Sequence, residues 1–208
     1  MVRIKQIERE QVLEQTKTRL FQAAAQEFAR AGYSDANINM ISTNAGFAKG
    51  TIYNYFPSKR ALLLALIDTS AKQHFNFIVD RVGVIPDPRK RIEMFYQAGF
   101  DYVSQNLAAA RVMFNTINGP DVTLKAHIFE VYQPLFQFVA DQILNLGIEQ
   151  GVFEQVDTAS MALLLMTIYL GTASQLDLDG RPWLDPNQIV DLVLNGLQKK
   201  EATSGDHD

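Results

Sequence analysis

Cysteine is absent from this chain of 208 residues, so disulfide bonds and thiolate-bound metal sites are excluded. Signals for β-strands are almost absent too, because no segment alternates apolar and polar residues and no Asn-Gly turn joins two such segments. Apolar runs such as Met161 to Met166 are far shorter than the roughly 20 residues that a membrane-spanning helix needs. We therefore expect a soluble helical protein without a membrane segment.

Neither a secretion signal nor a known catalytic arrangement is visible. The first residues alternate charged and polar side chains and lack the apolar core of a signal peptide. There is no Gly-x-Ser-x-Gly, no phosphate-binding loop, no His-Glu-x-x-His and no cysteine nucleophile. His74 and His127 stand alone, so we expect no metal site and no cofactor. The sequence favours a cytoplasmic protein that is not an enzyme.

Charge is unevenly distributed along the chain, whose net charge is −4. Residues 1–60 contain nine Lys and Arg side chains against five Asp and Glu, a net charge of +4, so residues 61–208 carry −8. An acidic body repels phosphate, but a locally basic end can still bind it. The asymmetry favours contact with nucleic acid at the N-terminal end, although the halves of many proteins differ by this much.

Helical periodicity runs through almost the whole sequence. The pattern predicts helices over residues 7–31, 38–45, 49–55, 58–82, 88–106, 108–118, 122–150, 158–177 and 186–200. Pro134 should kink or split the helix over 122–150, because proline lacks the backbone N–H that a helix interior uses. The fold class is therefore all-α, with about nine helices.

Two domains and a tail are expected. An N-terminal three-helix domain over residues 1–66 is joined by the long helix from Ser58 to a helical domain over 67–200. The polar segment 201–208 reads as a disordered tail.

Residues 38–66 have the pattern of a helix-turn-helix. Asn37 is a suitable N-cap for the first helix, and Gly46 can take the left-handed conformation that the sharp turn needs. Ile52 and Phe56 then point inward, and Ser58 begins the next helix. A second helix held from behind in this way fits the major groove of DNA.

The outward residues of that second helix suit contacts with bases. Lys49 and Asn54 are candidates for guanine and adenine edges respectively. Gly50 allows the backbone to approach closely, and Thr51 can bond a phosphate or touch a thymine methyl group.

Phosphate contacts are expected from the residues that follow. The hydroxyls of Tyr53 and Tyr55 can reach the backbone, and Lys59 is helped by the positive end of its helix. The alternative for an isolated tyrosine pair is ordinary packing, and for Lys59 with Arg60 it is a solvated helix start.

The ordered combination resembles the TetR (TetR/AcrR) family of transcriptional regulators over about residues 15–66. The matching residues are Ala45-Gly46-Phe47, Lys49-Gly50-Thr51-Ile52-Tyr53, Tyr55-Phe56, Ser58-Lys59 and Leu62, preceded by Phe28 to Tyr33. The sequence departs from the family at Ala48, where a capping Ser or Thr is usual, and this loss should cost about 1 kcal/mol. Asn37 and Asn39 stand where Thr and a basic residue are frequent, so we count both among the expected DNA contacts.

The resemblance implies a ligand pocket within the C-terminal helices. Large apolar side chains there suit an apolar or aromatic small molecule better than a highly charged one. The expected ligand-binding residues are Phe95, Phe100, Met113, Phe114, Phe129, Tyr132, Phe136, Met166 and Tyr169. The alternative is that these aromatic stripes are plain core.

The resemblance also implies a homodimer. The helix with Met161 to Met166 is apolar on all sides, and the last helix carries an apolar stripe, so the two can pair with their symmetry mates. The expected interface residues are Gly171, Ile189, Leu192, Val193, Gly196 and Leu197. The alternative is an intramolecular core.

The function that these expectations favour is DNA-binding transcriptional regulation. The implied mode is a repressor released from a near-palindromic double-stranded operator by a small apolar or aromatic ligand. Two other classes stay open: a helical small-molecule carrier without DNA function, and an all-α enzyme whose site has no recognised pattern.

Overall fold

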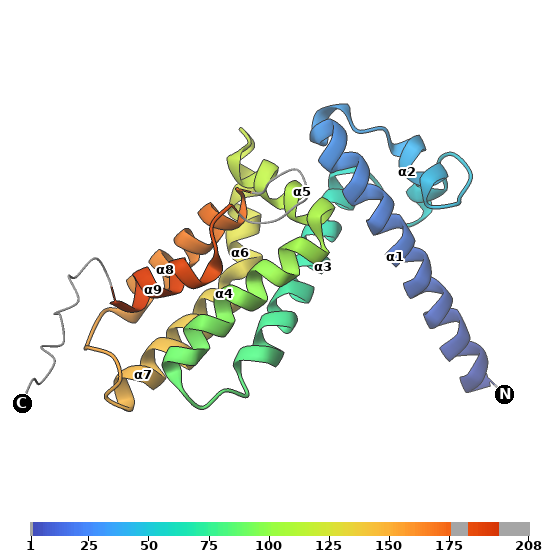
Figure 1. Ribbon diagram of the computed structural model, residues 1–208. Helices are drawn as coiled ribbons and strands as arrows, with labels where there is room; N and C mark the ends of the chain where they lie inside the picture. Colours follow the sequence, from blue (N-terminus) through green and yellow to red (C-terminus); the bar gives the residue numbers. More distant parts are fainter. Residues whose placement is uncertain (1, 176–182, 196–208) are drawn as a thin grey trace, which may run out of the picture.

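The computed structural model describes residues 2–175 and 183–195, with side chains from residue 12 onward. Within these ranges the chain forms helices and no strand, so the all-α prediction is confirmed (Figure 1). The elements are α1 Val2–Asp35, α2 Ile38–Asn44, the 3₁₀-helix η1 Thr51–Asn54, α3 Lys59–Val82, α4 Pro88–Gln105, α5 Leu107–Asn118, α6 Val122–Val139, the π-helical η2 Ala140–Asn145, α7 Leu146–Glu149, α8 Thr158–Ala173 and α9 Pro186–Asn195. None of the helices in this part of the chain is long and apolar enough to cross a membrane.

Local capping explains where the N-terminal helices begin and end. The side chain of Asn37 accepts hydrogen bonds from the backbone N–H groups of Asn39 and Met40, as the sequence predicts for an N-cap. Ser58 caps α3 by accepting from the N–H of Ala61. Gly32 has φ 73° and interrupts α1, but one further turn continues the helix to Asp35. The predicted end of the first helix at residue 31 is therefore a kink.

The predicted second helix of the helix-turn-helix, residues 49–55, is corrected to a single 3₁₀ turn, Thr51–Asn54. Gly50 precedes it in the left-handed conformation, φ 79°, and no side chain caps it. Ala48 has no side-chain oxygen that could bond the first free N–H groups, so nothing extends the helix toward residue 49. Gly46 has φ 83°, as the sharp turn requires.

One continuous helix, α3, links two clusters of buried side chains. Leu62, Leu63, Leu66 and Ile67 lie in the first cluster with the apolar face of α1, α2 and η1, and this cluster extends to buried residues of α5 and α6. Further along α3, Ile78 and Val82 lie in the second cluster, with α4, α6, α8 and α9. The same helix therefore contributes side chains to the core of the helix-turn-helix and to the core of the bundle.

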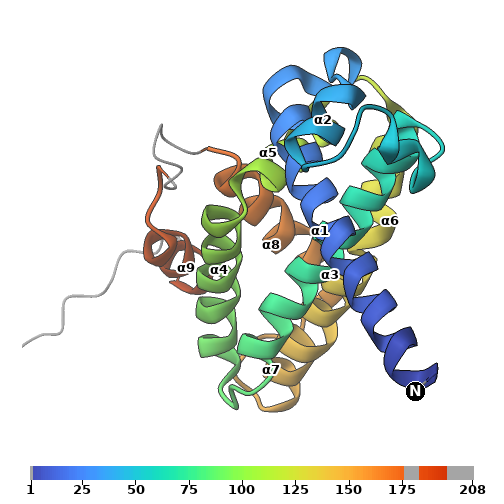
Figure 2. The ribbon, with the colours of Figure 1, turned by 90° about the vertical axis from the view of Figure 1, so that its right-hand side faces the viewer.

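The C-terminal helices form a bundle beside α3. In Figure 2, α4 and α3 run side by side with α6 on the far side of α3, and α9 lies on the outside of α4. The helix predicted over 122–150 is divided into α6, the π-helical η2 and α7, and Pro134 lies inside α6 without ending it. Residues 196–200 of the last predicted helix, and the predicted tail 201–208, lie outside the described residues.

Candidate functional site

A buried carboxylate fixes the entry to the helix-turn-helix. Glu27 of α1 is almost fully buried and accepts a hydrogen bond from the backbone N–H of Asn37 at 2.9 Å. Arg30 donates to both oxygens of the same carboxylate. The bond from the Asn37 N–H, opposed by burial and assisted by Arg30, lowers the pKa of Glu27. Glu27 therefore stays charged and holds the start of α2 against α1.

Lys59 also holds the connection between α1 and α2 in place. Its ammonium group donates to the backbone carbonyls of Ser34 at 2.7 Å and Ala36 at 3.2 Å, and it lies over the ring of Tyr33. The sequence predicted a phosphate contact for Lys59 but gave no sign of these internal partners. An ammonium group has three donors, so one remains for a phosphate.

The exposed face of the turn and of η1 carries the other predicted DNA contacts. Tyr53 and Tyr55 are 54% and 37% exposed, whereas Ile52, directly before them, is 1% exposed. Ile52 thus anchors the turn, and the three residues after it form an outward face. Asn37, Asn39, Lys49 and Asn54 are exposed as well, and Gly50 and Thr51 are partly buried.

Two interactions support this face from behind. Phe56 packs against Phe21 of α1, with 5.6 Å between ring centroids. The guanidinium of Arg19 lies over the ring of Phe47, 4.9 Å from its centroid, so the turn is fixed on α1. The polar and aromatic side chains of η1 thus lie on a surface that is held in place by α1, which suits docking into a DNA groove.

A cavity lies in the C-terminal bundle between α3, α4, α5, α6 and α8. Its lining consists of Ser70, His74, Tyr102, Val103, Ala109, Ala110, Met113, Phe114, Ile117, Ile128, Phe129, Tyr132, Phe136, Tyr169 and Leu170. Six of the nine predicted ligand residues line it: Met113, Phe114, Phe129, Tyr132, Phe136 and Tyr169. No lining residue is Lys, Arg, Asp or Glu.

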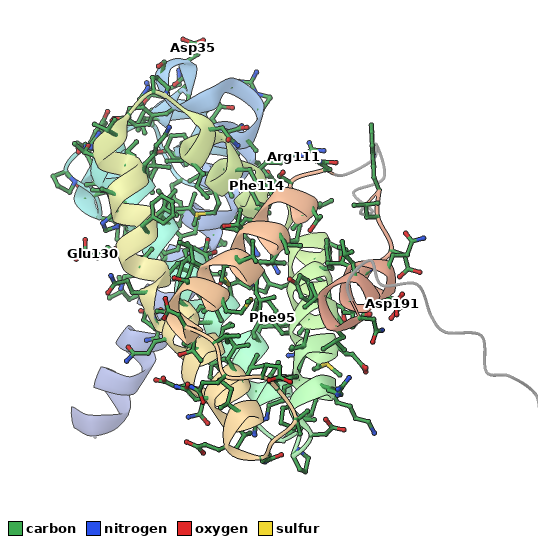
Figure 3. The ribbon with its side chains drawn as sticks, turned by 90° about the vertical axis from the view of Figure 1, so that its left-hand side faces the viewer. Asp35, Phe95, Arg111, Phe114, Glu130 and Asp191 are labelled. Atoms are coloured by element: carbon green, nitrogen blue, oxygen red, sulfur yellow. The ribbon has the colours of Figure 1, made fainter. Side chains whose placement is uncertain are left out.

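Three predicted ligand residues are corrected to core. Phe95, Phe100 and Met166 are buried in the second cluster and do not line the cavity. Figure 3 shows Phe114 nearer to the end of the molecule that carries Asp35, and Phe95 further from that end, between the helices. Helical spacing places an aromatic residue on an inner face but does not distinguish a filled core from a cavity wall.

The cavity is nearly closed. Its volume is about 30 Å³, room for about one water molecule. Pockets for small organic ligands are roughly 300–1,000 Å³. A ligand of that size therefore has to move the surrounding helices apart, and α3 is one of them.

A chain of hydrogen bonds at the inner end of the cavity was not predicted from the sequence. His74 of α3 has its Nδ1 atom 3.0 Å from the hydroxyl of Tyr132 and its Nε2 atom 3.0 Å from that of Tyr169. Burial lowers the pKa of His74 to about 3, so the imidazole is neutral near pH 7. Burial likewise raises the pKa of Tyr132 and of Tyr169.

An ion pair and a side-chain hydrogen bond join α3 to α6 nearer the helix-turn-helix. Arg60 donates to Asp121, the N-cap of α6, at 2.8 Å and also bonds Thr123. Asp68 and His127 are 2.6 Å apart. These contacts tie a wall of the cavity to the part of α3 that is rooted in the helix-turn-helix.

The predicted dimer residues divide into two groups. Gly171 and Leu192 are exposed, as are Leu163 and Leu164 of the apolar run. Ile189 is buried within the chain and is corrected to a support of α9 from within, whereas Val193 is partly buried against the same cluster and stays a predicted interface residue. Figure 3 shows Asp191 of α9 and Glu130 of α6 on opposite sides of the bundle. Gly196 and Leu197 lie outside the described residues.

Comparison with known proteins gives a consistent result for the N-terminal part and the fold. The family model described as "Bacterial regulatory proteins, tetR family" matches residues 20–66. The uncharacterised HTH-type transcriptional regulator YuxN of Bacillus subtilis is 24% identical over 189 residues, which cover 86% of this chain and 60% of YuxN. The chain thus spans less than two thirds of that relative.

Two of the similar solved structures share the fold of most of the chain. The transcriptional regulator FadR of Bacillus subtilis, in complex with stearoyl-CoA, has a TM-score of 0.76 at 20% identity and covers 87% of this chain and 99% of its own. AibR, in complex with isovaleryl coenzyme A and operator DNA, has a TM-score of 0.68 at 19% identity and covers 86% and 96%. Both similarities extend well beyond residue 66 and include the helical bundle.

Proposed function

Because the chain belongs to the TetR family of bacterial regulatory proteins, we propose that it is a cytoplasmic repressor that binds a near-palindromic DNA operator as a homodimer. An apolar ligand, such as an acyl chain or an aromatic ring, enters the cavity and releases the DNA. Two structural relatives bind acyl-coenzyme A ligands, and it is the apolar acyl chain of these ligands that supports this class.

The observation that carries this proposal is the course of α3. Leu62 and Leu63 of this helix lie in the core of the helix-turn-helix, and Ser70 and His74 line the cavity. A cavity of about 30 Å³ admits a ligand only if its walls move. The movement is then transmitted along one helix to the surface that faces DNA, which supports release rather than mere storage of the ligand.

The proposed DNA surface is tested with genomic DNA fragments selected by the purified protein and then sequenced. We expect one near-palindromic motif. Lys49→Ala should weaken binding to that motif by about 1–3 kcal/mol, because Lys49 is expected to contact a guanine edge. The loss of its charge beside the DNA should also reduce the slope of log affinity against log salt.

Lys72→Ala is the matched control, because Lys72 is exposed on α3 away from the turn. It should leave the affinity and the salt slope unchanged. If no fragment is enriched, the repressor function is rejected. The carrier without DNA function then becomes the better explanation.

A further inference from the structure

The inner end of the cavity is polar although its walls are apolar. Here His74 of α3 bonds Tyr132 of α6 and Tyr169 of α8, and its ring stacks on Tyr102 of α4 at 4.4 Å between centroids. His74 and Tyr169 are 3% and 0% exposed, whereas Phe129, which also lines the cavity, is 49% exposed. A ligand that enters past Phe129 therefore meets His74 with its leading end.

The direction of the hydrogen bonds follows from their acceptors. The hydroxyl of Tyr169 lies 3.1 Å from the carbonyl oxygen of Gly99, which can only accept. Tyr169 therefore donates to Gly99 and accepts from Nε2–H of His74, and Nδ1 accepts from the hydroxyl of Tyr132. This arrangement makes three bonds. The opposite tautomer makes two, because Tyr169 then donates to His74 and loses Gly99.

Only Tyr132 can give up its place to a ligand. Tyr169 is fully buried, and a Cβ atom on Gly99 would lie 2.6 Å from its ring, so the ring has no space in which to move. Tyr132 is only partly buried and lines the cavity. Its hydroxyl is the donor to Nδ1, and a ligand that takes this place must also donate.

Charged groups do not fit this end of the cavity. The lining contains no Lys, Arg, Asp or Glu, and the residues that face His74 are Tyr102, Tyr132 and Tyr169. An unpaired carboxylate or ammonium group would lose its hydration without gaining a partner of opposite charge. The complementary group is a neutral donor that is also small enough to replace a phenol hydroxyl.

We propose that His74 recognises a hydroxyl group at the buried end of an otherwise apolar ligand, which donates to Nδ1 in place of Tyr132. This proposal rests on the proposed function and names its ligand class: apolar alcohols or phenols, including hydroxylated acyl chains. Exchange of the donor breaks the bond between α6 and α3. The same step that recognises the ligand therefore frees α3 from its hydrogen bond to α6.

The test compares 1-octanol with 2-octanone, which have the same number of heavy atoms but differ in that only the alcohol donates a hydrogen bond. Binding is measured by displacement of the selected operator from the full-length protein. We expect 1-octanol to bind about ten-fold more tightly, the value of one buried hydrogen bond. In His74→Phe this preference should disappear, and in Tyr132→Phe it should increase because the competing donor is gone.

Tyr96→Phe is the matched control. Tyr96 is another fully buried tyrosine, and its hydroxyl donates to the carbonyl of Leu165 at 3.1 Å, outside the cavity. This variant should keep the preference for the alcohol. Equal affinities for the two probes, or no binding of 1-octanol up to its solubility, would overturn the hydroxyl proposal. Failure of the repressor function itself would show in the same samples as absence of the protein–DNA complex before any probe is added.

Discussion

Arg60 in the first turn of α3 donates a hydrogen bond of 2.8 Å to Asp121, the N-cap of α6. The bond from Arg60 is the main reason why the pKa of Asp121 is well below its usual range. Asp121 thus caps α6, which lines the cavity, and forms an ion pair with α3, which enters the DNA-binding part. We interpret this pair as a joint through which movement of α6 reaches α3.

Asp121→Asn tests the joint. Asn is an equally good N-cap, so α6 should begin normally while the ion pair is lost. We expect the same operator affinity without ligand but a smaller ligand-induced loss of affinity. The control is Asp157→Asn, because Asp157 caps α8 with no cation bonded to it among the described residues. An unchanged ligand response in Asp121→Asn would remove the pair from the coupling.

Gly50→Ala should impair DNA binding through backbone strain. Gly50 has φ 79°, and no atom would touch an added Cβ, so the effect is one of conformation and not of collision. The left-handed conformation costs roughly 1–2 kcal/mol for a residue with a side chain. Gly151→Ala, at φ 69° with equally open space, should lower the free energy of unfolding similarly but leave DNA affinity intact. Equal DNA affinities of the two variants would contradict a role for Gly50 in the DNA-facing turn.

Leu192→Asp should convert a dimer into a monomer. Leu192 is 47% exposed on α9, and Leu163 and Leu164 are exposed on α8, an apolar surface that a second copy can cover. Light scattering at micromolar concentration should give about twice the monomer mass for the wild type and the monomer mass for the variant. Val84→Asp replaces a more exposed apolar residue between α3 and α4 and should remain dimeric. A dimeric Leu192→Asp protein would place the interface elsewhere.

The free energy of unfolding should decrease as the pH is lowered, because of His74. Its pKa is about 3 in the folded state and ordinarily about 6.5, so below pH 6.5 the unfolded chain binds a proton that the folded chain does not. Stability is therefore fully present above pH 6.5 and is lost as the pH falls toward 3. Between pH 6.5 and 5 the loss should be about 1.5 kcal/mol.

Urea unfolding of the wild type and of His74→Phe at these two pH values measures that loss. In the variant, the free energy of unfolding should decrease less between these two pH values, because the contribution of His74 is missing. This holds whatever the stability of the variant at pH 7. The control is His127→Gln, which changes the histidine that bonds Asp68 near the surface. This variant should keep the pH-dependent loss of stability that His74 contributes. An identical decrease in the wild type and in His74→Phe would show that His74 is not buried as a neutral group.

The sequence predicted those features that are set by local chemistry. Asn37 and Ser58 cap their helices as expected, because an N-cap depends on a side chain and the next few N–H groups. Gly46 and the end of α3 at Val82 follow from local signals as well. The exposure of Tyr53 on the DNA-facing turn was indicated by the order of residues around Ile52.

Features that depend on distant segments were not predicted. The carbonyl partners of Lys59 are more than twenty positions away, and Tyr169 meets His74 across 95 positions. Helical spacing placed Phe95 and Phe100 on inner faces, but only the packing of α4 against α8 shows that they fill the core. The left-handed Gly50 and the shortness of η1 depend on the missing cap at Ala48 together with the supporting contacts of Phe47 and Phe56.

A ligand in the cavity is expected to weaken DNA binding. The most direct measurement is an equilibrium titration of the selected operator with the full-length protein, with and without the apolar ligand that most raises its melting temperature. We predict that the ligand raises the dissociation constant about 5–150-fold, the range of an allosteric coupling of about 1–3 kcal/mol. An unchanged constant would contradict coupling between the cavity and the helix-turn-helix, and a lower constant would make the ligand a corepressor.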